Sequence, residues 1–370
     1  MASNTRIFQL GDRSQVVFSA CSDDLRIQGG AEGQAEVLDR PDTSGLQVQQ
    51  TDQGLHITSA SPLAVRVPES AIVALQSCSG DALITRIREA HVGQHSGDLM
   101  LTKVGAAELS GINGDVQIGG GQSLRVTTLN GDLRVSATQG ELSLVGICGD
   151  ITLRSVAGHA EIRGITGDIS LRNPDGQIHV HDVNGNVELA GNLSSGEYTV
   201  ETNGDVALRL DQSSDARLEL EAPVGSISCS LRLSDTQQAA HALLGTLGQG
   251  SAKLRVIAAS GDIKVRATRG GDMEEALEEE MARVEQCARR AADRAERMAE
   301  KMRQRGQRLE EKARRRAERM ARIHSYGTLL RNQYAPADNA QQERLAVLKM
   351  LAEGKINAEQ AEALLSALES

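Results

Sequence analysis

Residues 149–172 read GDITLRSVAGHAEIRGITGDISLR, so the stretch that opens at Gly149-Asp150 begins again 18 residues later at Gly167-Asp168. The pair recurs along the middle of the chain at steps of 17 or 18 residues, at Gly80-Asp81, Gly97-Asp98, Gly114-Asp115, Gly131-Asp132, Gly149-Asp150 and Gly167-Asp168. A relaxed form continues at Gly185-Asn186, Gly204-Asp205 and Gly261-Asp262. A fixed period of this size predicts a repeat architecture. Such a fold presents a long surface rather than a deep pocket, which favours a scaffold over an enzyme.

Each repeat joins short alternating runs through glycine corners. In Ile151-Thr152-Leu153 and Ala160-Glu161-Ile162, apolar and polar residues alternate with period two, which is typical of a strand. Glycine permits positive φ at the corners, and Asp can bond to the local backbone. We therefore predict a mainly β fold, a parallel β-solenoid of 17–18-residue Gly-Asp repeats, over residues 1–271. Residues 1–79 begin it and cap its first edge, and residues 254–263 close the sheet.

Composition narrows the class of protein and its compartment. The chain has a net charge of −10 and 1% aromatic residues, and its first 271 residues carry 21 basic and 31 acidic side chains. Met1–Arg13 shows no signal peptide, and no apolar run reaches the roughly 18–20 residues that span a membrane. The cysteines are scattered and form no CxxC pair: Cys21, Cys78, Cys148, Cys229 and Cys287. We expect reduced thiols and a cytoplasmic protein.

Residues 272–325 differ in composition from the repeats. Their acidic start is followed by a basic segment, Arg283–Arg322. Apolar residues recur at alternating steps of four and three, at Leu277, Met281, Val284, Ala288, Ala291, Ala295, Met298 and Met302. This spacing predicts a long charged helix with a coiled-coil seam. An equally open interpretation is a partly solvated helix that packs on itself or on the solenoid.

The last 45 residues predict a linker, 326–340, and a short helical hairpin, 341–370. Asn357, with Gln360 three residues later, has the spacing of a capping box at the second helix. The apolar positions of the two helices are Leu345, Leu348, Leu351, Leu364, Leu365 and Leu368. A unit of this size is too small to be stable alone, so we expect it to pair with a second copy or another protein.

Two parts of the chain resemble parts of one kind of bacterial protein. Val65-Arg66-Val67-Pro68, Ser79-Gly80-Asp81 and Ser260-Gly261-Asp262-Ile263 resemble the "putative adhesin" β-solenoid family of unknown function over roughly residues 20–268. Residues 344–365, with Glu353-Gly354-Lys355-Ile356, resemble the SHOCT-like (short C-terminal) hairpin found in the same proteins. The resemblance implies a non-enzymatic protein, sometimes tied to envelope-stress responses, and brings no catalytic residues.

Candidate sites are few. The repeated carboxylates form an expected ladder, for which we favour turn stabilisation over cation binding: Asp81, Asp98, Asp115, Asp132, Asp150, Asp168 and Asp205. His179 and His181 share one strand face, with Glu161 and Arg163 expected alongside, and we favour a solvated face over a zinc site. We expect no catalytic, cofactor-binding or metal-binding residues.

The sequence therefore predicts a non-enzymatic scaffold or protein-interaction protein that forms a homo-oligomer through residues 272–370. The residues expected to mediate self-association are Leu277, Met281, Val284, Met298, Met302, Leu345, Leu348, Leu351, Leu364, Leu365 and Leu368. The alternatives are a surface adhesin, and a binder of anionic membrane surfaces or nucleic acid through Arg283–Arg322.

Overall fold

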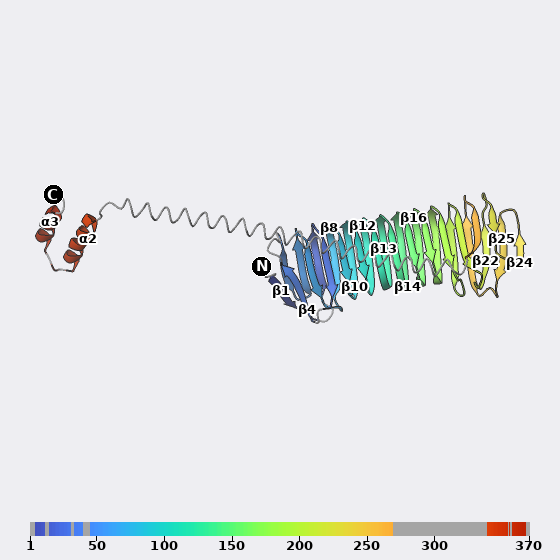
Figure 1. Cartoon of the computed structure of the whole chain (residues 1–370), viewed down its shortest axis with the longest axis horizontal. Helices are drawn as coiled ribbons and strands as arrows, with labels where there is room; N and C mark the ends of the chain where they lie inside the picture. Colours follow the sequence, from blue (N-terminus) through green and yellow to red (C-terminus); the bar gives the residue numbers. More distant parts are fainter. Residues whose placement is uncertain are drawn as a thin grey trace. The chain divides into compact units, whose positions relative to one another are not determined.

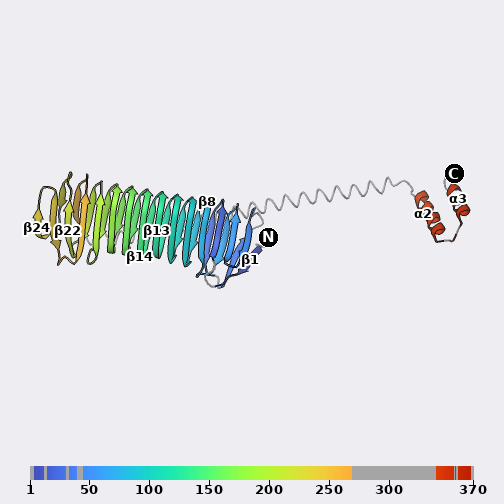
Figure 2. The same ribbon diagram turned by 180° about the vertical axis from the view of Figure 1, so that it is seen from behind.

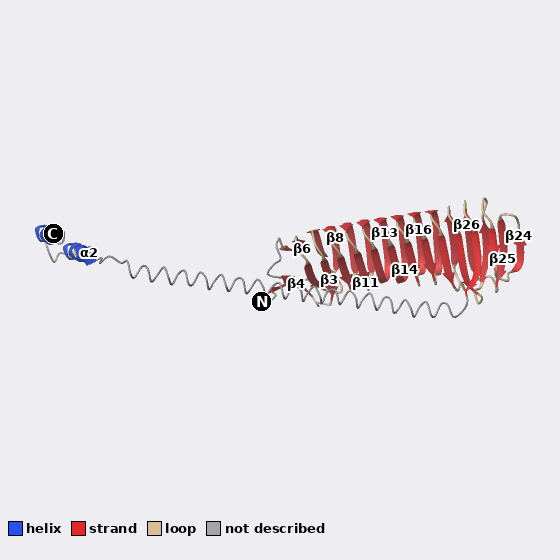
Figure 3. Ribbon diagram, turned by 45° about the horizontal axis from the view of Figure 1, so that its top comes forward, coloured by secondary structure: helices blue, strands red, loops and turns tan. Residues whose placement is uncertain are grey.

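The computed structural model describes residues 4–11, 15–30, 33–39, 45–268, 339–353, 355 and 357–367. The chain divides into two compact units, residues 1–276 and 277–370. All 27 strands of the described residues lie in the first unit and form one continuous sheet, so the predicted mainly β class is confirmed. Figures 1 and 3 show these strands stacked side by side in an elongated array.

The strands form two hydrogen-bonded rows. In spatial order, the row that contains the strands after the Gly-Asp corners is β1 (Asn4–Gln9), β4 (Gln34–Asp39), β7 (Leu63–Val67), β3 (Leu25–Gly29), β9 (Ala82–Thr85), β11 (Leu99–Thr102), β13 (Val116–Asn130), β14 (Leu133–Cys148), β15 (Ile151–Arg154), β17 (Ile169–Arg172), β19 (Val187–Gly191), β21 (Val206–Asp211), β27 (Ile263–Thr268) and β23 (Ile227–Cys229). We call this the corner row.

The second row, here the facing row, shares β13 and β14 with the first because each of these long strands runs through both. Its spatial order is β5 (Gln47–Thr51), β6 (Gly54–Ser59), β2 (Gln15–Cys21), β8 (Ile72–Ser79), β10 (Glu89–Ser96), β12 (Ala106–Asn113), β13, β14, β16 (Ala157–Thr166), β18 (Asp175–Asn184), β20 (Glu197–Thr202), β26 (Ala252–Ala258), β22 (Ala216–Glu221), β25 (Ala242–Leu247) and β24 (Ser234–Gln238).

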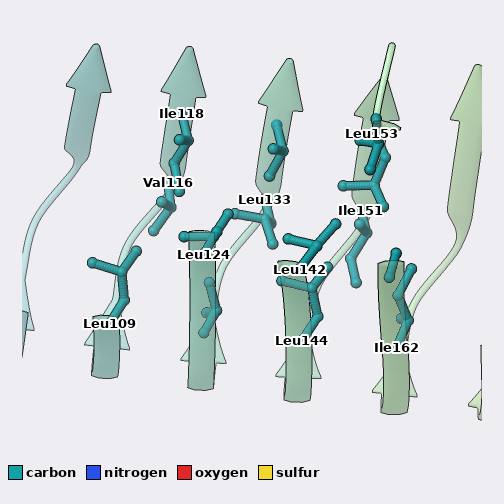
Figure 4. Packing of buried hydrophobic residues seen from close by; sticks show 14 of the residues in the cluster. Leu109, Val116, Ile118, Leu124, Leu133, Leu142, Leu144, Ile151, Leu153 and Ile162 are labelled. Carbon is teal, nitrogen blue, oxygen red and sulfur yellow. The ribbon is translucent and has the colours of Figure 1, made fainter. Parts of the chain in front are cut away.

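Aliphatic side chains from both rows fill the space between them. Ile151 pairs with Ile169, and both are 1% exposed, whereas Thr152 between Ile151 and Leu153 is half-buried. Figure 4 shows Leu133 and Ile151 of the corner row facing Leu142 and Leu144 of the other. The predicted in-and-out alternation is therefore confirmed at Ile151 and Thr152. No single strand encloses this core, so each one is stabilised by the strands stacked above and below it.

The strand order at the two ends departs from the sequence order. One strand from each row makes up what we call a coil. The coil of β2 and β3 lies between β6/β7 and β8/β9. The coil of β26 and β27 lies between β20/β21 and β22/β23. The prediction that residues 254–263 close the sheet is therefore wrong. They are inserted one coil inward because every coil carries the same alternating pattern and can stack on any other.

Antiparallel strands lie beyond the outermost parallel coils. At the first end β1 pairs with β4, which pairs with β7, and β5 pairs with β6. At the other end β22 pairs with β25, and β25 with β24, whose Ser234–Gln238 side chains are exposed. Figure 2 shows β1 and β24 at opposite ends of the array. A short polar edge strand discourages pairing with further chains, so residues 1–79 do cap the first edge as predicted.

The second unit contains two helices, α2 (Asn339–Ala352) and α3 (Ala358–Ala367), which contact each other. The backbone N–H of Gln360 donates to Asn357 Oδ1 over 2.9 Å, and the N–H of Asn357 donates to Gln360 Oε1 over 3.2 Å. This confirms the predicted capping box. Helix α2 begins at Asn339, so the predicted linker ends two residues early, within the uncertainty of any helix boundary. Residues 272–325, with the predicted seam, and Leu368 lie outside the described residues.

Candidate functional site

A ladder of side-chain to backbone hydrogen bonds runs along the Gly-Asp corners. The N–H of Asp98 donates to Asp81 Oδ1 over 3.1 Å, and the same bond of 2.8–3.1 Å joins each corner to the next: Asp24 to Asp81, Asp81 to Asp98, Asp98 to Asp115, Asp115 to Asp132, Asp132 to Asp150, Asp150 to Asp168, Asp168 to Asn186, Asn186 to Asp205, Asp205 to Asp262 and Asp262 to Ser226. Each acidic or amide oxygen thus accepts the N–H of the neighbouring corner. These bonds support the turn-stabilising interpretation of the ladder.

The ladder borders a shallow hollow of about 330 Å³ that is lined by Asp150, Asp168, Asn186, Asp205 and Lys264, among others. At its far end, hydrogen bonds from the backbone and hydroxyl of Ser226 lower the pKa of the Asp262 carboxyl. Among the described residues, no group of three or more His, Cys, Asp or Glu side chains is arranged to hold a metal ion. A carboxylate that already accepts a backbone N–H has fewer lone pairs for another ligand.

A second hollow, of about 420 Å³, lies on the outer surface of the facing row. Glu161 pairs in register with His179, and Arg163 with His181, which confirms the predicted neighbourhood. His181 Nε2 is 3.9 Å from Glu161 Oε1, and Arg163 is 3.8 Å from the same oxygen. His159 adds a third imidazole, with its ring centre 5.7 Å from that of His179. The guanidinium neutralises the carboxylate that would otherwise complete a cation site, so this is a polar surface patch.

The two-helix unit exposes most of its apolar positions. Val347 and Ala361 are buried, whereas Leu345, Leu348 and Leu364 are 68%, 51% and 43% exposed. Leu351 is 37% exposed and Leu365 is half-buried, so the described members of the predicted self-association set remain largely uncovered: Leu345, Leu348, Leu351, Leu364 and Leu365. Large apolar side chains gathered on so small a unit mark an interaction surface more often than chance exposure does. The remaining predicted members lie outside the described residues.

Residues 39–266, more than half of the chain, match the protein family described as Toastrack DUF4097. The chain belongs to the Toastrack DUF4097 family. Residues 342–370 of this Toastrack protein match a SHOCT-like domain, so the hairpin has the identity that its sequence indicated. No curated protein matches the chain.

Solved structures similar to this Toastrack protein come from anaerobic gut and soil bacteria. A "putative adhesin" from Parabacteroides merdae is 10% identical, with 71% of this chain and 95% of that chain covered and a TM-score of 0.30. A "putative cell adhesion protein" from Clostridium sporogenes is 10% identical over 72% and 100% of the two chains, with a TM-score of 0.17. A "putative lipid binding protein" from Parabacteroides distasonis is 11% identical over 71% and 96%, with a TM-score of 0.26. Scores this low carry no information about function.

Three inward-facing residues were not singled out from the sequence. Cys21, Cys78 and His95 lie next to one another in the facing row. A hydrogen bond with Cys78, together with burial, raises the pKa of the Cys21 thiol, and burial lowers the pKa of His95 despite Asp98 and Asp81 nearby. Their sequence positions gave no signal because β2 stacks on β8 out of sequence order. None of the helices among the described residues is long and apolar enough to cross a membrane.

Proposed function

We propose that this protein is a non-enzymatic scaffold that self-associates through its helical C-terminus, residues 272–370. The single observation that supports the proposal most is the exposed leucine surface of the SHOCT-like unit, with Leu345, Leu348 and Leu364 uncovered. Two short helices enclose little apolar volume, and each Leu that a partner buries is worth roughly 1.5–3 kcal/mol. A second copy of the same unit provides an apolar surface of matching kind, as expected for a two-fold dimer.

We propose further that the sheet is a parallel β-solenoid in which each 17–18-residue Gly-Asp repeat forms one coil. The pairing of Leu99 with Val116 and of Ile151 with Ile169, one repeat apart, supports this. The solenoid then acts as a rigid presenting surface, and the C-terminal helices bring two such surfaces together. A link to envelope-stress responses rests on the family resemblance alone, and the adhesin alternative has no observation that favours it.

The proposal is tested by comparing the full chain with a chain that ends at Gly271. Multi-angle light scattering at micromolar concentration should give a dimer for the full chain and a monomer for the shortened one. Both should give the same β-rich circular dichroism from the sheet, since the strands end at Thr268. A monomeric full chain would contradict self-association and would direct the search to a different protein partner, for which crosslinking and pull-down with and without residues 341–370 is the next experiment.

A further inference from the structure

Three chemically reactive side chains form one column in the core near the first end of the sheet. Cys21 of β2 pairs in register with Cys78 of β8, and Cys78 pairs with His95 of β10. The three residues are 3%, 5% and 2% exposed. They therefore occupy equivalent inward positions on three consecutive strands of the facing row, even though 57 residues separate the two cysteines in sequence.

The same column is aliphatic in the coils that follow. From His95 onward, the paired inward residues are Ile112, Leu129, Ile147, Ile165 and Val183. A buried free cysteine alone needs no explanation, because it packs as a small apolar side chain. The imidazole does need one, since neither Nδ1 nor Nε2 of His95 has a hydrogen-bond partner among the described residues. A buried polar group without a partner costs about 1–3 kcal/mol.

The strand geometry discriminates between two ways of joining the thiols. Neighbouring strands lie about 4.8 Å apart, and side chains in register on parallel strands point the same way. A disulfide prefers β-carbons only about 3.8 Å apart, so it would require these two strands to move. Two metal–thiolate bonds of about 2.3 Å placed end to end span about 4.6 Å, close to the strand spacing. Thiolates in a pocket without oxygen ligands select soft ions such as Cu(I).

We propose that Cys21 and Cys78 bind one monovalent thiophilic metal ion, Cu(I) or Ag(I), as a two-coordinate bridge between β2 and β8, with His95 donating an imidazole N–H to the sulfur of Cys78. Two metal–sulfur bonds form, the two S–H bonds break, and both protons leave to solvent, with no change of oxidation state. The bridge needs only two ligands, in keeping with the absence of any three-ligand group in the described part of the chain. It would hold the inserted coil of β2 and β3 against the next coil.

The test uses the full chain in which Cys148, Cys229 and Cys287 are replaced by Ser, so that only the buried pair can bind the metal. The reduced protein is titrated with Cu(I) under anaerobic conditions against a chromogenic Cu(I) chelator. We expect one equivalent of Cu(I) retained per chain and a higher melting temperature than for the metal-free protein. Cys21→Ala or Cys78→Ala should each weaken retention by more than about 100-fold, beyond what loss of an outer-shell partner costs.

His95→Leu restores the aliphatic column and should weaken Cu(I) retention by about 10- to 100-fold, as expected when an outer-shell hydrogen-bond donor is removed. An unchanged affinity in this variant would overturn the role assigned to the ring. The bridge itself is overturned if the protein with only the buried pair retains no Cu(I) against the chelator, or if Cys21→Ala retains it equally well. Should the alanine variants fail to fold, X-ray absorption of the Cu(I)-loaded parent decides, because the bridge requires two sulfur ligands and no others.

Discussion

The N–H of Asp262 donates to Oδ1 of Asp205 over 2.8 Å, although 57 residues separate the two in the chain. Between them lie β22–β25, which the chain places beyond the final coil before it returns to insert β26 and β27. Ser226 then takes the position that an aspartate holds elsewhere, and its N–H and hydroxyl both donate to Asp262 Oδ1. The corner ladder thus follows the order of the coils in space and not the order of the sequence.

The first prediction concerns the glycine of a corner. Gly149 has φ +152°, and a Cβ at this position would lie 2.2 Å from the carbonyl oxygen of Gly131 in the preceding coil. Gly149→Ala should therefore destabilise the sheet by about 2–5 kcal/mol, because backbone strain and the displaced carbonyl both contribute. Urea unfolding followed by circular dichroism measures the change.

Gly119→Ala is the matched control, since a Cβ there would have Ser136 Oγ as its nearest atom, at 3.9 Å. Its free energy of unfolding should stay within about 1 kcal/mol of the wild type. Equal destabilisation by the two substitutions would show that close approach of the coils at the Gly-Asp corner is not what requires glycine.

The second prediction concerns the two faces of one strand. Ile151→Asp places an unpaired charge in the core, where Ile151 is 1% exposed, and should cost more than about 3 kcal/mol of the free energy of unfolding. The neighbouring change, Thr152→Asp, should cost less than about 1 kcal/mol, since that side chain points to the solvent-facing side. Comparable losses in thermal and urea unfolding would be incompatible with the alternation of the strand.

The third prediction concerns the loop that leads into β26. Asp215 accepts hydrogen bonds from the Ser251 hydroxyl and from the backbone N–H groups of Gln249, Gly250 and Ser251, and these lower its pKa below the ordinary value. A carboxyl whose pKa is lower in the folded than in the unfolded state contributes stability that is complete above its unfolded pKa, near 4. That stability is lost as the pH falls through the folded pKa.

Stability of the wild type should therefore fall from about pH 5 downward, and Asp215→Asn should make this fall less steep while lowering stability at neutral pH. Ser251→Ala, which removes the largest cause of the shift, should act in the same direction. The check is the urea midpoint measured at pH values from 7 to the acid range. Superimposable pH profiles for wild type and Asp215→Asn would exclude the proposed linkage.

The local features of this fold could be predicted from the sequence because they depend on neighbouring residues. Glycine corners, alternating strands and the Asn357–Gln360 cap each follow from chemistry within a few positions, and the cap is present as predicted. The stacking order of the terminal coils could not be predicted, since coils with the same apolar alternation are interchangeable partners. The column of Cys21, Cys78 and His95 exists only because of that order, so no spacing in the sequence indicates it.

The last prediction concerns the SHOCT-like unit. Leu348→Asp combined with Leu364→Asp places two charges on the exposed apolar surface of α2 and α3 and should convert the expected dimer to a monomer. Both side chains are already largely solvent-exposed, so the helicity of the unit and the melting of the sheet should change little. The control adds the same charges beside them, at the exposed positions Lys349→Asp and Ser366→Asp, and should leave the dimer intact. Light scattering at micromolar concentration measures both, and dissociation by the control pair as well would show that net charge, not the leucine surface, governs association.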